Sequence, residues 1–185
     1  LHSSAMHSEL RIRPEARNDY SRVSAVVAAA FGSPAEADLV EAIRASEHYR
    51  PEMALVAERN DAIVGHVMIS GATLRTVAGD RSVPALAPLA VAPDHQGRGI
   101  GSALVRAVCA IAADSGEPLV LVEGDPRYYA RFGFEPSYRY GIEMPLPEWA
   151  PREAGQVLRL SGFAPEMQGT VIYPPAFGDI TNAAP

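Results

Sequence analysis

A glycine-rich loop is the part of this chain whose residue types are best suited to chemistry. An apolar run over 83–91, interrupted by Pro88, precedes the sequence Gln-x-x-Gly-x-Gly at Gln96–Gly101. A helical pattern begins directly afterwards at Ser102. Such a loop presents several backbone N–H groups at the positive end of a helix, and this arrangement binds phosphate. The spacing therefore predicts a strand, a phosphate-binding loop and a helix, in that order.

The proline within the apolar run adds a second expectation. Pro88 has no N–H to donate, so we expect a bulge or a splay of the sheet at this point. The backbone groups of Leu89, Ala90 and Val91 would then be unpaired on one side of their strand. An open strand edge beside a phosphate-binding loop would suit an extended ligand.

A second motif follows at Gly124–Phe134, where Tyr129 stands four residues before a Gly-Phe pair. The two stretches together resemble the two signatures of the GNAT family of N-acetyltransferases, and they occur in that family's order. This resemblance covers residues 12–134 well. The tail from Tyr138 onward contains Gly-Thr-Val-x-Tyr-Pro-Pro-Ala-Phe and looks like the ending of the YhbS-like subgroup of bacterial predicted N-acetyltransferases.

The resemblance implies acetyl-CoA as the cosubstrate. The sequence contains no metal-ligand spacing, so no metal is expected. The resemblance also implies that the pyrophosphate lies on the N–H groups of 96–102, with Arg98 free to approach a phosphate, and that the pantetheine arm pairs with 89–91 like an added strand. The residues that it assigns to coenzyme binding are Leu89, Ala90, Val91, Gln96, Gly97, Arg98, Gly99, Ile100, Gly101, Ser102 and Tyr129.

The catalytic roles also follow from the resemblance. Tyr129 matches the tyrosine whose hydroxyl faces the coenzyme sulfur and acts as general acid, and a tyrosine remains protonated at neutral pH. The neighbouring Tyr128 is expected to point elsewhere. Glu123 is the first candidate for the base, Glu58 and His66 are weaker candidates, and a chain of waters can replace a side-chain base.

These assignments predict an enzyme that moves an acetyl group from the CoA thioester to a primary amine by direct transfer in a ternary complex. The acceptor is a small-molecule or peptide amine, with specificity expected in 47–51, 70–81 and the C-terminal tail. A non-catalytic acyl-CoA sensor is one alternative. A dinucleotide-binding oxidoreductase is another, because the glycine pattern approaches Gly-x-Gly-x-x-Gly and Glu123 follows about 20 residues later, although the third glycine is missing.

Composition excludes several other classes. The 185 residues include 16 basic and 22 acidic side chains, and the net charge of −6 opposes a nucleic-acid or anionic-membrane partner. No apolar run approaches the roughly 20 residues that span a bilayer, so the expected location is the cytoplasm, without membrane attachment. Cys109 is the only cysteine and is expected in the core. Either a monomer or a homodimer is compatible with the sequence.

Local patterns give the order of the elements. We expect residues 1–8 to be an expression remnant and a disordered N-terminus, 9–180 a single N-acetyltransferase domain, and 181–185 a frayed C-terminus. A capping box is expected at Ser33–Glu36. Strands are expected at 10–13, 53–58, 63–69, 83–91, 118–123, 156–160 and 169–173, and helices at 19–31, 34–46, 101–115 and 126–132. This order predicts a mixed α/β structure of the α+β type with the GNAT fold: a mostly antiparallel central sheet, one splayed parallel pair and flanking helices.

Overall fold

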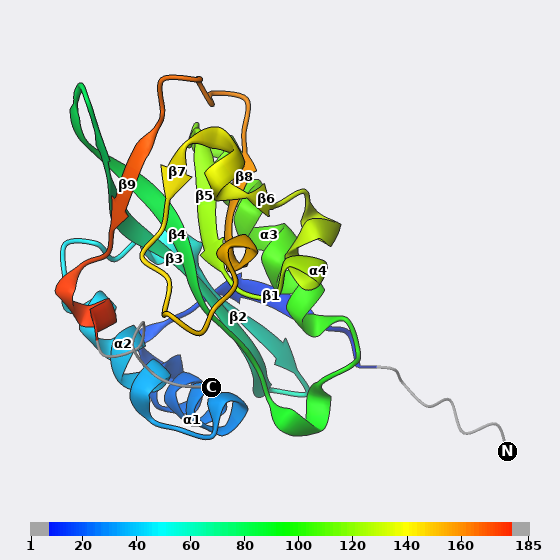
Figure 1. The fold of residues 1–185 in the computed structure, drawn as a ribbon. Coiled ribbons are helices and arrows are strands. Elements are labelled where there is room, and N and C mark those ends of the chain that lie inside the picture. Colours follow the sequence, from blue (N-terminus) through cyan, green and yellow to red (C-terminus); the bar gives the residue numbers. More distant parts are fainter. Residues whose placement is uncertain (1–7, 179–185) are drawn as a thin grey trace, which may run out of the picture.

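The computed structural model describes residues 8–178, so the expectations for 1–7 and 181–185 lie outside the described residues. A mixed sheet forms the centre of the molecule (Figure 1), with strand order β1-β2-β3-β4-β5-β8-β6, while β9 pairs with both β3 and β7. The strands are β1 (Arg11–Pro14), β2 (Ala54–Arg59), β3 (Ala62–Thr76), β4 (Gly79–Val91), β5 (Leu119–Glu123), β6 (Glu135–Pro136), β7 (Ile142–Glu143), β8 (Gly155–Arg159) and β9 (Gly169–Ile172). The predicted fold class is confirmed, and β6 and β7 are two short strands that the sequence patterns did not predict.

Helices cover both faces of the sheet. They are α1 (Tyr20–Phe31), α2 (Ala35–Arg44), α3 (Ile100–Asp114) and the short α4 (Pro126–Tyr129), which a 3₁₀ turn over Ala130–Phe132 extends. The apolar residues of α1 and α2 form one core cluster with the sheet, and those of α3 form a second cluster that includes Tyr129. In Figure 1, α1 and α2 accordingly lie on one side of β4, and α3 and α4 on the other.

The sheet opens beside Pro88, as predicted. Strand β5 pairs with β4 in parallel only at Ala85 and Leu86. On the other edge of β4, the register against β3 shifts between Val67 and Ile69, directly opposite the Pro88 region. Beyond Leu86, therefore, no described strand pairs with β4 on the β5 side, and the edge of 89–91 is open.

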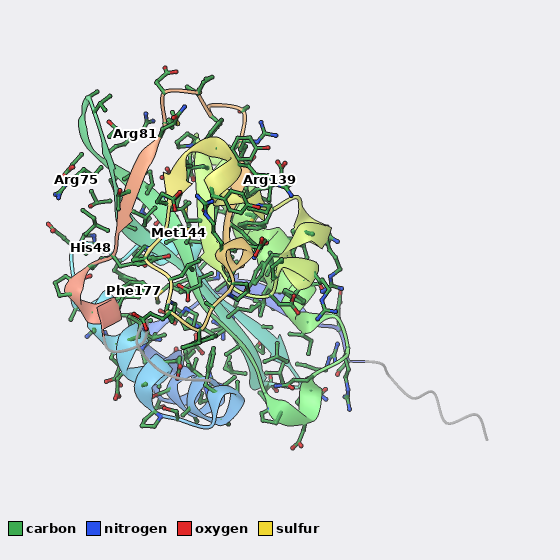
Figure 2. All side chains as sticks on the ribbon, in the orientation of Figure 1. His48, Arg75, Arg81, Arg139, Met144 and Phe177 are labelled. Carbon is green, nitrogen blue, oxygen red and sulfur yellow. The ribbon has the colours of Figure 1, made fainter. Side chains whose placement is uncertain are left out.

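The segment after Ile69 is strand rather than the expected connection. The β3–β4 ladder continues to Thr76, which is paired with Gly79, so 70–81 forms a long hairpin. Arg75 and Arg81 lie on this projecting hairpin (Figure 2). On its other edge, β3 pairs with β9 from Thr73 to Arg75, so this part of the hairpin belongs to the sheet.

The predicted capping box at the start of α2 is wrong. Helix α1 ends at Phe31 and is followed by Gly32, whose φ is 66°, and the N–H of Ser33 then donates to the carbonyl of Ala28 (3.3 Å). A capping box needs that N–H for Glu36. Ser33 instead accepts a hydrogen bond from the N–H of Ala35 through its hydroxyl (3.2 Å), and the Glu36 carboxylate is released from the expected role.

Candidate active site

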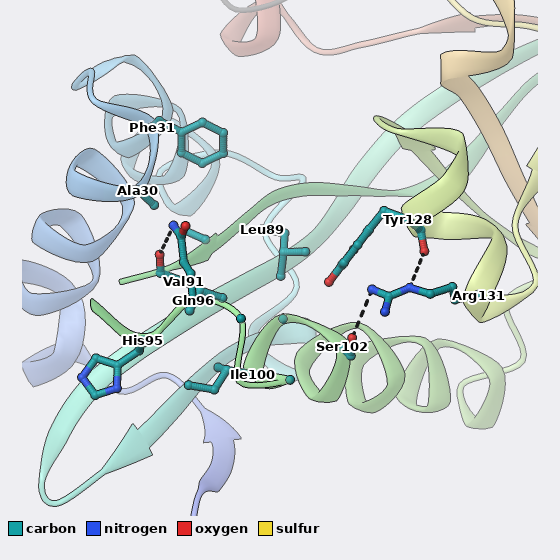
Figure 3. Close-up of a pocket in the computed structure, with 14 residues that line it drawn as sticks. Ala30, Phe31, Leu89, Val91, His95, Gln96, Ile100, Ser102, Tyr128 and Arg131 are labelled. Atoms are coloured by element: carbon teal, nitrogen blue, oxygen red, sulfur yellow. Dashed lines mark hydrogen bonds between the residues drawn. The ribbon is translucent and has the colours of Figure 1, made fainter. Parts of the chain in front are cut away.

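The glycine loop forms one wall of a cavity of about 470 Å³, which we call the loop cavity (Figure 3). The opposite wall comes from the end of α1 and from the second motif. Nine of the residues predicted to bind coenzyme line it: Leu89, Ala90, Val91, Gln96, Gly97, Gly99, Ile100, Gly101 and Ser102. The open edge of β4 and the start of α3 thus face the same space, as the sequence predicted.

The conformation of the loop depends on glycine at two positions. Gly97 and Gly99 have φ values of 74° and 81°, in the left-handed region that disfavours side chains. The Gln96 side chain donates to the carbonyl of Val91 (3.1 Å), which ties the loop back to the strand that precedes it. No side chain caps the start of α3, so its first-turn N–H groups are available to a ligand in the loop cavity.

A positive charge faces this helix start. Arg131 lies across the ring of Tyr128, with 4.5 Å between the guanidinium carbon and the ring centre, and donates to the hydroxyl of Ser102 (3.4 Å). Figure 3 shows its side chain reaching toward α3. Arg98, which was predicted for this role, is exposed and does not line the cavity.

A second cavity, of about 490 Å³, continues from the first. Phe31, Leu89 and Tyr128 line both cavities and so mark the junction. Because the second cavity lies where β4 and β5 diverge, we call it the splay cavity. Its other lining residues are Glu36, Leu39, Leu86, Ala87, Pro88, Glu123, Gly124, Asp125, Tyr129, Tyr173 and Phe177. Phe177 belongs to the C-terminal turn (Pro175–Phe177), beside α2 (Figure 2).

Tyr129 lines the splay cavity and is only 9% exposed. Its ring packs edge-on against Phe134, and a β-carbon at Gly124 would lie 2.6 Å from its Cε2 atom, so glycine is required there. Burial raises the pKa of the Tyr129 hydroxyl above its ordinary value. The group is therefore protonated at neutral pH, as a general acid must be.

The expectation that Tyr128 points away from the site is wrong, because Tyr128 lines both cavities. Its hydroxyl would lie 2.8 Å from a β-carbon placed on Gly101, at the start of α3. Figure 3 shows its ring standing between Leu89 and the helix. The two adjacent tyrosines diverge on the short helix, with ring planes 86° apart, and both face the cavities.

Of the three candidate bases, the structure places only Glu123 in the site. It ends β5 and lines the splay cavity, and desolvation by burial raises the pKa of its carboxyl above the usual range. His66 is completely buried, 3.2 Å from the Glu15 carboxylate, and burial lowers its pKa. Glu58 forms an ion pair with Arg13 at the β1–β2 edge.

Other sequence expectations concern groups outside the site. Cys109 is buried in the core, where desolvation raises the pKa of its thiol to about 12, which agrees with a packing role. Among residues 8–178 there is no group of three or more His, Cys, Asp or Glu side chains that could hold a metal ion. Within the same range, no helix is long and apolar enough to cross a membrane.

Several lining residues were not predicted from the sequence. They are Ala30 and Phe31 at the end of α1, Glu36 and Leu39 on α2, His95 before the loop, Asp125 and Arg131 in the second motif, and Tyr173 and Phe177 in the tail. Of the three segments expected to set specificity, only the tail lines the splay cavity. The tail motif at 169–177 was the available signal for Tyr173 and Phe177, and Arg131 lies within the second motif itself.

Comparison with known proteins identifies a matching family and similar proteins. Residues 11–137 match the model of a family described as an acetyltransferase (GNAT) domain. The uncharacterized N-acetyltransferase YjhQ of Escherichia coli K12 is 36% identical over 135 residues, which cover 71% of this chain and 75% of YjhQ. The uncharacterized N-acetyltransferase YhbS, also of E. coli K12, is 31% identical over 151 residues, which cover 81% of this chain and 87% of YhbS.

Two solved structures are similar over nearly their whole length. A GNAT acetyltransferase from Brucella melitensis in complex with acetyl-CoA has a TM-score of 0.75 and 30% identity, over 92% of this chain and 99% of that one. The E. coli YhbS structure in complex with CoA has a TM-score of 0.81 and 29% identity, over 95% of this chain and 96% of that one.

Proposed function

The chain belongs to the GNAT acetyltransferase family, and on this premise we propose that it transfers an acetyl group from acetyl-CoA to a primary amine by direct transfer in a ternary complex. The observation that carries the proposal is the meeting of the two cavities at Phe31, Leu89 and Tyr128, beside the open edge of β4. One cavity has phosphate-binding geometry and the other holds the candidate acid and base. Their junction is where a thioester would meet an amine.

The loop cavity suits the coenzyme. The pyrophosphate would lie on the first N–H groups of α3, with Arg131 beside it, and the pantetheine arm would run along 89–91 like an added strand. The complexes of the Brucella enzyme with acetyl-CoA and of YhbS with CoA support this choice of ligand. Arg98 remains a proposed phosphate contact from outside the cavity, since its side chain is exposed.

The chemistry requires one bond to form and one to break. The lone pair of a neutral amine attacks the thioester carbonyl carbon, and a free N–H of 89–91 stabilises the negative charge that develops on the oxygen. The C–N bond forms, the C–S bond breaks, and the thiolate takes a proton from the Tyr129 hydroxyl. The proton lost by the amine passes to Glu123, directly or through water, so that the products are an amide and CoA.

The environment of each group favours its proposed role. Burial keeps the Tyr129 hydroxyl protonated until a thiolate forms beside it. Burial also makes the Glu123 carboxylate more basic than one in water, which improves a proton acceptor. Tyr128, at the junction of the cavities, is proposed as a contact to the coenzyme arm and not as the acid.

The dinucleotide-binding alternative is contradicted by the fold. A nucleotide-binding α/β sheet is largely parallel, whereas β4 pairs with β3 in antiparallel fashion and β3 with β2 likewise.

An acyl-CoA sensor would bind the coenzyme without turnover. Assays that measure binding and turnover separately distinguish a sensor from an enzyme.

The proposed function is tested by coenzyme binding and then by release of CoA. Acetyl-CoA at 100 times its Kd should stabilise the fold by about 2.7 kcal/mol and raise the Tm by roughly 5–10 °C, whereas NAD should not. A panel of primary amines should then release CoA thiol and yield an acetylated product by mass spectrometry. A larger Tm shift with NAD would contradict the coenzyme assignment, and binding without turnover of any amine would favour the sensor.

A further inference from the structure

The splay cavity has an acidic and aromatic lining. Three carboxylates face it, from Glu36, Glu123 and Asp125, and no Lys, Arg or His side chain of the described residues lines it. Asp125 is engaged at the start of α4, where its side chain accepts from the N–H of Arg127 (2.9 Å). The cavity therefore favours a cationic ligand and offers no basic side chain to a carboxylate.

Glu36 is the carboxylate that the fold itself leaves unsatisfied. Its Oε2 atom is buried and has no hydrogen-bond partner among the described residues. The N–H that could have held it, that of Ser33, donates to Ala28 instead. A buried carboxylate oxygen without a donor is costly, and buried polar groups almost always have a hydrogen-bond partner, so this oxygen needs a donor from outside the chain.

Glu36 and Glu123 line the cavity from two separate elements. Glu36 comes from the first turn of α2, while Glu123 ends β5. The reacting nitrogen must lie at the divergence of β4 and β5, on the Glu123 side. Glu36 then faces the end of the acceptor that does not react.

We propose that the acceptor carries a second positive charge, remote from the nitrogen that is acetylated, and that Glu36 binds it. The segment between the two nitrogens is apolar, because aromatic and aliphatic side chains such as Phe31, Leu39 and Phe177 form most of the remaining surface. This inference rests on the proposed function and identifies the substrate class as lipophilic diamines. Glu36 is a specificity-determining residue in this scheme, and it takes no part in bond formation.

Three acceptors of nearly equal shape test the inference. para-Xylylenediamine, 4-ethylbenzylamine and 4-(aminomethyl)phenylacetic acid share the reacting aminomethyl group and differ at the remote end, which is positive, neutral or negative. We expect kcat/KM to fall in that order. In Glu36→Gln, kcat/KM for the diamine should fall about 10- to 100-fold, the range for a lost hydrogen bond to a charged group, while that for 4-ethylbenzylamine changes less than about 2-fold.

Glu41→Gln is the matched control, because it makes the same change at an exposed position of the same helix. It should leave all three acceptors unchanged. Calorimetric titration of the enzyme–CoA complex with the diamine and with 4-ethylbenzylamine gives a second readout that does not depend on turnover, and Glu36→Gln should reduce only the diamine affinity.

Two results would overturn the inference. Equal kcat/KM and equal affinity of the diamine and 4-ethylbenzylamine in the wild type would show that no second charge is recognised. Equal losses for both amines in Glu36→Gln would place Glu36 at the reacting nitrogen. In either case acetyl-CoA would still raise the Tm and CoA would still be released, whereas failure of the proposed function would abolish the release of CoA from every amine.

Discussion

A single methyl group at Gly101 should weaken coenzyme binding without destabilising the protein. A β-carbon there would lie 2.8 Å from the Tyr128 hydroxyl oxygen and 3.6 Å from Cγ2 of Val91. Carbon–oxygen contacts are usually about 3.3 Å or longer, so the Tyr128 ring must move by roughly 0.5 Å. That ring lines both cavities, and displacing it narrows the path of the coenzyme arm.

The magnitudes separate this effect from misfolding. In the free protein the end of the Tyr128 side chain can move aside, so the overpacking cost of about 1–3 kcal/mol arises when the coenzyme fills the cavity, and the Kd for acetyl-CoA in Gly101→Ala should rise by roughly 5- to 150-fold. Alanine is a better helix former than glycine by about 1 kcal/mol, and Gly101 lies in the first turn of α3, so the Tm should be unchanged or slightly higher. Titration calorimetry and thermal unfolding measure the two quantities independently.

The clashing oxygen offers an internal check. In a Tyr128→Phe background that oxygen is absent, and Gly101→Ala should then change the Kd less than about 3-fold. Gly116→Ala, at a left-handed position (φ 80°) beyond the far end of α3, should lower the Tm but leave the affinity unchanged. An unaltered Kd in Gly101→Ala, or an equal loss with and without the Tyr128 hydroxyl, would refute the reasoning.

Three further predictions follow from the site and its support. Tyr129→Phe should slow turnover by about 10²- to 10⁴-fold at nearly unchanged acetyl-CoA affinity. Tyr140→Phe is the control, because the Tyr140 hydroxyl bonds to a glutamate outside both cavities, and this variant should keep the wild-type rate. Equal steady-state rates of Tyr129→Phe and the wild type would exclude the acid role. Glu123→Gln should remove the acidic limb that Glu123 gives to the kcat–pH profile, measured with saturating amine. This limb lies above the ordinary glutamate pKa because burial raises the pKa of Glu123, and its persistence would favour a water chain. Glu15 is a buried partner of Arg44, so Glu15→Gln should cost about 3–5 kcal/mol of unfolding free energy near pH 7. Burial opposes ionisation of Glu15, but hydrogen bonds from Arg44 and His66 lower its pKa to about 2. The difference in unfolding free energy between wild type and Glu15→Gln, measured by urea titration, should therefore shrink as the pH falls from about 4.3 toward 2. A difference that stays constant over this range would contradict this.

The parts of the site that are made by local sequence were predictable. The strand, loop and helix around 96–102 need glycines and a helix start within a few residues, so their pattern is visible in the chain itself. The opening of the sheet at Pro88 was predictable for the same reason, since a missing N–H interrupts a ladder wherever it lies. The short helix that carries Tyr129 was likewise marked by its own Asp-Pro start and by the Gly-Phe pair.

The parts that depend on distant segments were not predictable from local patterns. The sequence Ser33–Glu36 matches the pattern of a capping box. The Glu36 carboxylate is free for the cavity because the Ser33 N–H donates instead to Ala28, at the end of α1. The sequence places Tyr128 and Tyr129 side by side, but their directions depend on packing against Gly101 and Gly124. The edge of the long β3–β4 hairpin pairs with β9, nearly 100 residues further along the chain, and local patterns do not reveal such a partner.

The central claim is tested most directly by a crystal structure of the protein with bound CoA. We expect the pyrophosphate on the N–H groups of Gln96–Ser102, the pantetheine arm along 89–91, and the sulfur within about 3.5 Å of the Tyr129 hydroxyl. Such a complex would also show whether Tyr128 contacts the arm and not the sulfur. CoA bound outside the loop cavity, or with its sulfur remote from Tyr129 and the splay cavity, would contradict the proposed transfer.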